Sequence, residues 1–167
     1  SENFVDNQGG GAGVYMRGGN LLMEDCSVLR NNTRNTGSGA GLFLNFDLAS
    51  VSVLRRCTIA DNTADSQGTG IGLIVRAGVS TLEDCTIDNN VSADTGTEAA
   101  GGVIVGTAGQ GGTLNLVRCT ISRNGSDIGG GLIVRTGSAT LLNCTVSGNV
   151  ARGEAGGISV DAGQSAT

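Results

Sequence analysis

Met23-Glu24-Asp25-Cys26-Ser27-Val28-Leu29-Arg30-Asn31 is the first full copy of a phrase that occurs five times in this chain. Its shared features are an aliphatic residue, a cysteine three positions later, Ser or Thr, then Val or Ile, and an asparagine five positions after the cysteine. The successive cysteines are 31, 28, 34 and 25 residues apart. A phrase that recurs at such a period is typical of a solenoid, in which each copy forms one turn.

A second phrase, small-Gly-aliphatic-x-aliphatic, alternates with the first. Its glycines are Gly13, Gly41, Gly72, Gly102, Gly131 and Gly157. Side chains alternate along a strand, so its two aliphatic residues face the same side, as do the cysteine and the following Val or Ile of the first phrase. The aliphatic residue three positions before each cysteine is out of phase with it, which predicts a bend between them. The stretches after each asparagine are rich in Gly, Ser, Thr, Asp and Ala, which is typical of loops.

Stacked turns of two or three such strands form parallel sheets around one narrow core. The sequence therefore predicts an all-β fold, a parallel β-helix (β-solenoid) of about six rungs with uncapped ends, and a single domain over residues 1–167. The first phrase also fits a leucine-rich repeat, but that fold needs a helical or convex segment where this chain has a strand pattern. A 59-residue period, shared by Arg17, Arg76 and Arg135, indicates that the repeating unit is a pair of rungs.

Composition supports a thin core. The 167 residues include 30 Gly and no Pro, and only 2% are aromatic, which suits a narrow interior filled by small aliphatic side chains. The net charge is −5 and the ten positive charges form no basic cluster, so we expect no nucleic-acid partner. No apolar run is long enough to span a membrane.

The cysteines occupy one repeat position, and their number is odd, so they do not indicate a disulfide framework. No two lie within four residues, so they lack metal-site spacing as well. We expect a column of buried thiols that act as small apolar groups. Adjacent rungs are about 4.8 Å apart, which leaves one or two disulfides between rungs as an alternative. This core ladder comprises Cys26, Cys57, Cys85, Cys119 and Cys144.

The asparagines fall three residues after the last inward aliphatic residue of the phrase, at a predicted turn. A buried amide there can bond to the backbone and to the next asparagine along the stack. Some of these positions also match glycosylation sequons, but burial would prevent modification. The predicted Asn ladder comprises Asn3, Asn31, Asn62, Asn90, Asn124 and Asn149.

Two columns are expected to face outward. Ser27, Thr58, Thr86, Thr120 and Thr145 form one, for which cross-rung hydrogen bonding is the main explanation and ice binding an alternative. The residue between the aliphatics of the second phrase forms the other, a large apolar stripe that is a candidate lateral interface. The alternatives are that a loop covers this stripe or that the strand faces are reversed. Its members are Tyr15, Phe43, Ile74, Ile104 and Ile133.

Catalytic signals are weak. The chain has no His or Lys and no nucleophile motif. Its acidic pairs are adjacent residues, which face opposite sides of a strand, so we expect no enzymatic activity. No cofactor is expected either; Ca²⁺ at turn aspartates is an alternative, but no calcium-binding nonapeptide is present. The acidic residues considered are Glu24, Asp25, Asp61, Asp65, Glu83, Asp84, Asp88, Asp94 and Asp127.

The two phrases resemble the right-handed parallel β-helix repeats of bacterial surface and secreted proteins. They are similar to the repeats of chlamydial polymorphic outer-membrane proteins, with Cys-Thr-Ile-x-x-Asn in place of Phe-x-x-Asn. The resemblance implies a right-handed β-helix, exported to the cell surface or outside a bacterium or other prokaryote, with an adhesive, surface-layer or matrix role. Such repeats define a scaffold more than an activity.

Neither end carries a helix or a polar cap. We therefore expect a segment of a longer solenoid, or a subunit whose ends stack on further copies. The function expected is a structural or adhesive building segment of a surface fibre, stalk or matrix, with end-to-end self-association and other surface proteins or carbohydrate as further partners. The alternative is a carbohydrate-active enzyme similar to pectate lyases, or a carbohydrate-binding module.

Overall fold

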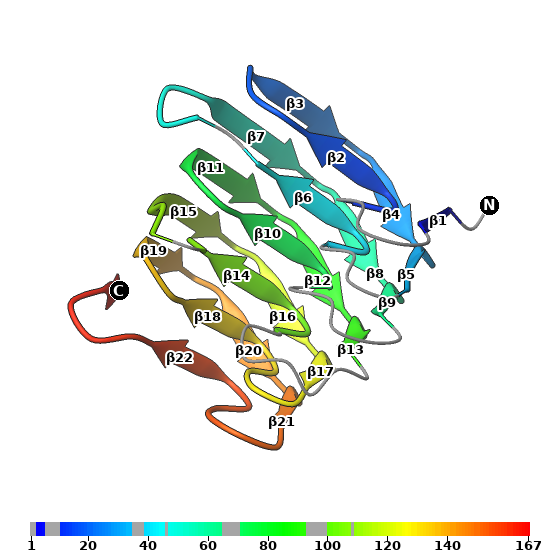
Figure 1. Ribbon diagram of the computed structural model, residues 1–167, viewed down its shortest axis with the longest axis vertical. Helices are drawn as coiled ribbons and strands as arrows, with labels where there is room; N and C mark the ends of the chain where they lie inside the picture. The colour runs from blue at the N-terminus through cyan, green and yellow to red at the C-terminus, as the bar shows by residue number, and fades with distance from the viewer. Residues whose placement is uncertain are drawn as a thin grey trace.

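The computed structural model describes residues 3–5, 11–34, 39–45, 47–64, 71–92, 100–107 and 109–167. Over these residues the chain winds into a solenoid of parallel strands, and successive turns stack along one axis (Figure 1). Five complete turns comprise β2–β5, β6–β9, β10–β13, β14–β17 and β18–β21. Strand β1 precedes them and β22 and β23 follow, so the prediction of a parallel β-helix with about six rungs is confirmed.

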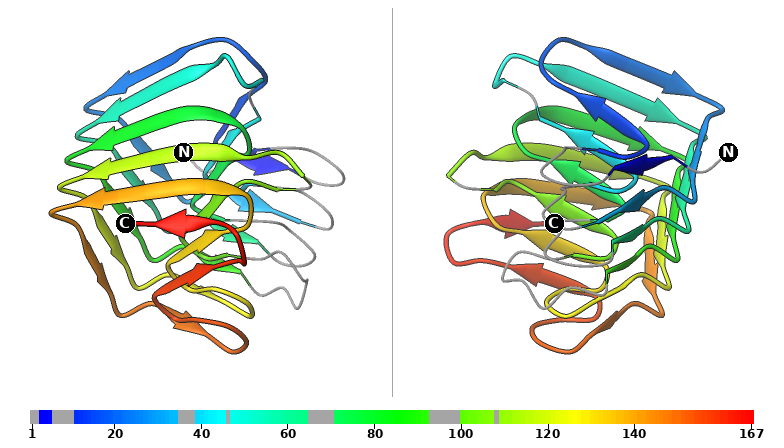
Figure 2. Two further views of the ribbon diagram at one scale, coloured as in Figure 1. Left: turned by 90° about the vertical axis from the view of Figure 1, so that its left-hand side faces the viewer. Right: turned by 45° about the vertical axis from the view of Figure 1, so that its right-hand side comes forward.

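Each complete turn contributes one strand to each of four parallel sheets (Figure 2). Sheet 1 contains β1 (Phe4–Val5), β5 (Asn32–Thr33), β9 (Thr63–Ala64), β13 (Val91–Ser92), β17 (Gly125–Ser126) and β21 (Val150–Ala151). Sheet 2 contains β2 (Val14–Met16), β6 (Leu42–Leu44), β10 (Leu73–Val75), β14 (Val103–Val105), β18 (Leu132–Val134) and β22 (Ile158–Val160).

The cysteine phrase supplies the other two sheets. Sheet 3 contains β3 (Leu21–Glu24), β7 (Val51–Arg55), β11 (Gly78–Glu83), β15 (Gly112–Val117), β19 (Gly137–Leu142) and β23 (Ser165–Ala166). Sheet 4 contains β4 (Ser27–Leu29), β8 (Thr58–Ala60), β12 (Thr86–Asp88), β16 (Thr120–Ser122) and β20 (Thr145–Ser147). Equivalent residues of the repeat pair throughout; Leu73, for example, lies between Leu42 and Val103.

The predicted bend before each cysteine is present between sheets 3 and 4. The residue before each cysteine has a positive φ of 51–54°, and it is Asp25, Arg56, Asp84, Arg118 or Asn143. A second set with positive φ lies immediately before the ladder asparagines and comprises Arg30, Asp61, Asn89, Arg123 and Gly148. Each left-handed residue reverses the phase of the side chains, which lets the flanking strands all point their apolar residues inward.

The main core fills the space between sheets 2, 3 and 4. Leu73 and Val75 of sheet 2 meet Leu82 of sheet 3 and Ile87 of sheet 4, and all four are fully buried. The glycine before each of the first five sheet 2 strands is required by close approach: a Cβ on Gly72 would lie 2.4 Å from Gly102 O and 3.0 Å from Asn90 Nδ2. A Cβ on Gly157, before β22, would meet nothing within 4 Å. The two phrases are therefore coupled, because the glycine of one leaves room for the asparagine of the other.

Candidate functional site

The Asn ladder runs along the axis beside sheet 1. Each ladder amide from Asn3 to Asn124 donates from Nδ2 to Oδ1 of the asparagine in the next turn, from Asn3 to Asn31 at 2.8 Å and finally from Asn124 to Asn149 at 2.9 Å. The same Oδ1 also accepts the backbone N–H of the preceding ladder residue, as Asn90 Oδ1 does from Asn62 at 3.1 Å. Asn31, Asn62, Asn90 and Asn124 are buried.

The ladder has a direction. Every hydrogen bond between two ladder asparagines runs from Nδ2 to the Oδ1 of the higher-numbered turn. From Asn62 onward, Nδ2 also donates to a backbone carbonyl of the preceding turn. Within the described residues, Asn3 Oδ1 therefore accepts no hydrogen bond, and Asn149 Nδ2 donates only one, to Ile121 O at 2.9 Å. One end of the ladder presents an acceptor and the other presents a donor, so the two ends are chemically complementary.

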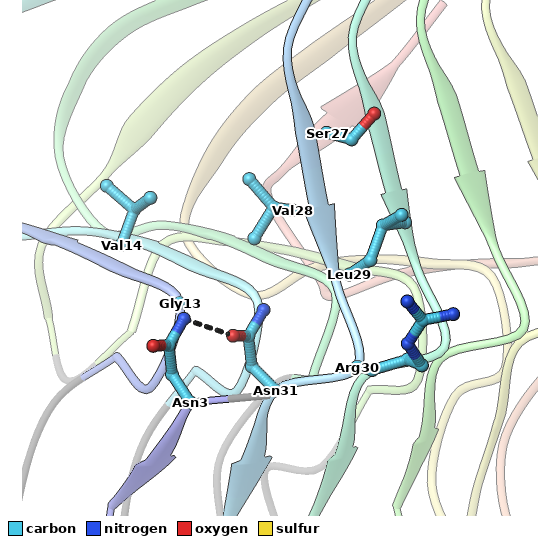
Figure 3. Close-up of a pocket in the computed structure, with 8 residues that line it drawn as sticks. All are labelled: Asn3, Gly13, Val14, Ser27, Val28, Leu29, Arg30 and Asn31. Atoms are coloured by element: carbon cyan, nitrogen blue, oxygen red, sulfur yellow. Dashed lines mark hydrogen bonds between the residues drawn. The ribbon is translucent and has the colours of Figure 1, made fainter. Parts of the chain in front are cut away.

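An open hollow of about 240 Å³ lies at the acceptor end, in the first complete turn. Figure 3 shows Asn3 and Asn31 side by side at its edge, joined by their hydrogen bond, with Val14 and Val28 beside them. Val14 faces the core, yet it is only partly buried, whereas its partner Leu42 is fully buried. The hollow is lined by Asn3, Gly13, Val14, Ser27, Val28, Leu29, Arg30 and Asn31.

The opposite end also shows core positions to solvent. Ile158 and Val160 of β22 are 41% and 40% exposed, whereas their partners Leu132 and Val134 in β18 are 1% and 0% exposed. The register places these two side chains on the same face as in the other turns. They are exposed because no further described turn packs against β22. Each end of the described solenoid therefore combines an apolar surface, a free strand edge and one end of the Asn ladder.

The five cysteines line the core side of sheet 4, and all are free thiols. Cys57, Cys85 and Cys119 are buried, whereas Cys26 and Cys144 in the first and last complete turns are partly exposed. Each thiol donates to the carbonyl two residues before it, as Cys85 Sγ does to Glu83 O at 3.3 Å. The neighbouring Cys119 thiol and burial raise the pKa of Cys85, which keeps it protonated.

The predicted lateral interface requires a correction, because four of its five side chains are buried. Phe43 is 8% exposed and Ile74 is 1% exposed, and only Tyr15, in the first turn, is largely exposed, at 43%. Ile104 and Ile133 are fully buried in a small cluster outside the main core, with Ala100 and Ile128. The column thus faces away from the main core as predicted, but it is not an exposed stripe.

Where the segment before a sheet 2 strand is described, its last residues lie against the outward side chain of that strand. The residue four positions earlier is small, and its backbone lies directly against the outward side chain: a Cβ on Gly39 would lie 2.8 Å from Phe43 Cβ. Ala100, Gly129 and Ala155 occupy this position in later turns and pair with each other as a short parallel ladder. Of the alternatives open from sequence, coverage by the preceding segment is the one observed at the described residues Gly39, Ala100 and Gly129.

Charges alternate along the corner between sheets 3 and 4. Arg56 makes a two-pronged ion pair with Asp25, at 2.7 and 2.8 Å, and Arg118 makes the same pair with Asp84. Hydrogen bonds from these arginines lower the pKa values of Asp25 and Asp84. This alternation of acidic and basic turns accounts for the two-rung unit of the sequence.

The carboxylates within the described residues each accept a hydrogen bond from Arg, Ser, Asn or a backbone N–H, as Asp61 does from Asn89 at 2.8 Å. Asp65 and Asp94 lie outside those residues. A general acid needs a raised pKa, and the pKa values of Asp25 and Asp84 are lowered. Where the chain is described, no group of three His, Cys, Asp or Glu side chains is arranged to hold a metal ion.

The outward column of sheet 4 pairs in register from Ser27 through Thr58, Thr86 and Thr120 to Thr145. The sequence analysis did not predict that Arg17 and Arg76 line one hollow. Their 59-residue spacing does indicate that they hold equivalent positions two turns apart. The described part of the chain contains no helix that is long and apolar enough to cross a membrane.

Comparison with known proteins identifies one family. The model of the family described as "Right handed beta helix region" matches residues 1–111 of the 167. Neither the curated proteins nor the solved structures that were searched include a match. The matched region covers about two thirds of the chain, and the stacked parallel strands continue through the remainder. The chain belongs to the right-handed beta helix family.

Proposed function

We propose that this chain is a non-catalytic structural segment of an extracellular fibre, stalk or matrix, and that it works by stacking end to end with a second copy. The observation that carries the proposal is the direction of the Asn ladder, which offers an acceptor at Asn3 and a donor at Asn149. A head-to-tail contact joins these two groups, and because it does not close on itself it extends into a filament.

The strand edges support the same contact. In sheet 2, β2 and β22 are the two edge strands, so β22 of one copy and β2 of the next can pair as neighbouring turns do within the chain. This pairing places Ile158 and Val160 against Val14 and Met16, the same aliphatic contact that internal turns make. Burying exposed apolar residues and unpaired edge groups together is the usual driving force for such association.

A non-catalytic role is supported by the partners of the described acidic residues. Their carboxylates bond to Arg, Ser, Asn or backbone groups, and Arg56 and Arg118 hold Asp25 and Asp84 in the ionised form. The extracellular location in this proposal rests on the resemblance of the repeat to bacterial surface proteins. On the same resemblance, we propose that the chain adheres to other surface proteins or to carbohydrate.

Electron microscopy and sedimentation of the purified 167-residue chain test the proposal. We expect filaments or concentration-dependent oligomers for the natural chain and monomers for Ile158→Lys, which puts a charge on the exposed end of β22. Leu142→Lys is the matched control, because Leu142 is also exposed in the last complete turn but faces sideways from sheet 3. This control variant should assemble like the natural chain.

Two results would contradict the proposal. Monomers at every protein concentration would remove end-to-end stacking as the mechanism, as would assembly of Ile158→Lys to the same extent as the natural chain. Release of new reducing or unsaturated ends from acidic polysaccharides by the purified chain would show that it is a carbohydrate-active enzyme instead.

A further inference from the structure

A second polar column follows the corner between sheets 2 and 3. It consists of the residue immediately after each sheet 2 strand, and these residues stack in register through backbone hydrogen bonds such as Arg76 N to Leu44 O at 3.0 Å. The column lies at the ends of β2, β6, β10, β14, β18 and β22 (Figure 1). From first to last its members are Arg17, Asn45, Arg76, Gly106, Arg135 and Asp161.

Arg135 shows what a guanidinium at this corner binds. Its Nη1 donates to Asp161 Oδ1 at 3.0 Å, in the next turn of the same column, and to Glu154 Oε1 and Oε2 at 3.1 and 3.3 Å. The chain therefore supplies two carboxylates to this arginine. Arginine and carboxylate are well matched because the planar guanidinium offers several N–H groups at once.

Arg76 stands in the same position two turns earlier, and no carboxylate among the described residues forms an ion pair with it. The next residue of its column is Gly106, which has no side chain, and the preceding one is Asn45, whose Oδ1 accepts from Arg76 Nη1 at a long 3.4 Å. Its Nε makes no hydrogen bond within the described residues, a feature that does not by itself distinguish it from Arg135. Among the described residues, no ion pair includes Arg76 or Arg17.

These two arginines line a hollow of about 360 Å³, with Gly18, Asn45, Asp47 and Gln110. They are two turns apart, about 9.6 Å along the axis at the usual spacing of strands. The carboxylate of Asp47 is already held by Ser50 Oγ at 2.7 Å and by the backbone N–H of Ala49 at 3.2 Å. The hollow thus has a net positive lining in a chain whose net charge is −5.

We propose that this hollow binds the carboxylate of a small anionic ligand, with Arg76 as the main contact and Arg17 as the second. The ligand supplies to Arg76 the carboxylate that Asp161 and Glu154 supply to Arg135. Asn45 positions Arg76 and is itself held by a hydrogen bond from Nδ2 to Tyr15 Oη at 3.1 Å. This site lies on the side of the solenoid, so it is independent of end-to-end stacking.

Titration of the Ile158→Lys chain, which we expect to be monomeric, with sodium glucuronate and, separately, sodium sulfate, followed by amide NMR shifts, tests the proposal independently of assembly. We expect glucuronate to shift the resonances of the column, and Arg76→Gln to weaken its binding about tenfold or more, because a charge-assisted hydrogen-bond pair is lost. Arg152→Gln is the matched control: Arg152 is exposed and pairs with Asp127 on the other side of the turn, so binding should be unchanged.

Asn45→Asp gives a second, independent variant that keeps the size of the side chain. It supplies Arg76 with an internal carboxylate, as Asp161 does for Arg135, so it should abolish glucuronate binding and raise the thermal midpoint. Equal binding by Arg76→Gln and the natural chain would overturn the proposal, as would the absence of any glucuronate shift. Binding of sulfate without glucuronate would overturn the assignment of a carboxylate.

Discussion

Replacing Asn90 by alanine tests the Asn ladder at its centre. In the folded chain, Asn90 Oδ1 accepts from the backbone N–H of Asn62 at 3.1 Å and from Asn62 Nδ2 at 2.8 Å. Its Nδ2 donates to Ile59 O and to Asn124 Oδ1, both at 3.0 Å. Alanine removes all four hydrogen bonds and leaves two donors of Asn62 without their acceptor in a fully buried place.

The expected cost follows from these two donors. Each buried donor that loses its partner costs about 1–3 kcal/mol, so Asn90→Ala should lower the free energy of unfolding by about 2–6 kcal/mol. That is a large part of the about 5–15 kcal/mol that typically stabilises a domain. The loss should be smaller for Asn149→Ala, because Asn149 is only partly buried and donates one hydrogen bond fewer within the described residues.

Guanidinium denaturation followed by far-ultraviolet circular dichroism measures these values. Asn89→Gly is the matched control: Asn89 is the preceding residue, its φ is 50°, and its side chain makes one exposed hydrogen bond to Asp61. Glycine tolerates this φ, so the control should stay within about 0.5 kcal/mol of the natural chain. A loss below about 1 kcal/mol for Asn90→Ala would refute the view that the ladder stabilises the fold.

Four further predictions concern packing, pH and thiol reactivity. Gly72→Ala should cost about 1–3 kcal/mol, because its Cβ would lie 2.4 Å from the backbone oxygen of Gly102 and would also crowd Asn90 Nδ2. Gly157→Ala should have little effect, because a Cβ there meets nothing within 4 Å, and the thermal midpoints of the two variants measure the difference. Because the pKa of Asp84 is lowered in the folded state, its ion pair with Arg118 stabilises the fold fully above the ordinary pKa of 3.8. This stabilisation is lost as the pH falls through the lower pKa of the folded state. The stability difference between the natural chain and Arg118→Gln should therefore vanish in acid, and a difference that persists there would contradict this pairing. Ellman's reagent should react with Cys26 and Cys144 before unfolding and with Cys57, Cys85 and Cys119 only after it, as read by mass spectrometry of the modified peptides. Ile104→Ala should destabilise the chain by about 2–5 kcal/mol without changing its association, which sedimentation and denaturation together measure; a change in association alone would restore the lateral interface.

The architecture could be predicted from sequence because its signals are local and repeated. Leu82, Cys85 and Ile87 share a core only if a bend separates the first two, and the left-handed Asp84 provides that bend. The same short-range pattern recurs in every turn, so a strand that is ambiguous in one copy can be assigned by aligning it with the other copies. The positions of the cysteines and asparagines follow from this register.

The burial of the outward column that contains Ile104 could not be predicted from these local patterns. Ile104 alternates with Val103 and Val105, and this pattern predicts its face but not what covers it. Coverage depends on the path of the segment that precedes the strand, where Ala100 lies close enough to pack against Ile104. Loop paths are set by contacts between turns, which strand periodicity does not encode.

By itself, the sequence determined the parallel turns and the inward residues, because strand alternation leaves few other solutions. The close contact of Gly72 with Asn90 became visible only in the structure. Only the tertiary structure decided the direction of the Asn ladder and the pairing of charges from turn to turn. It also decided the difference between Arg135, which has carboxylate partners, and Arg76, which has none among the described residues. The physical reason is that hydrogen bonds and ion pairs depend on the distance and orientation of atoms in neighbouring turns, about 25–35 residues apart in the chain.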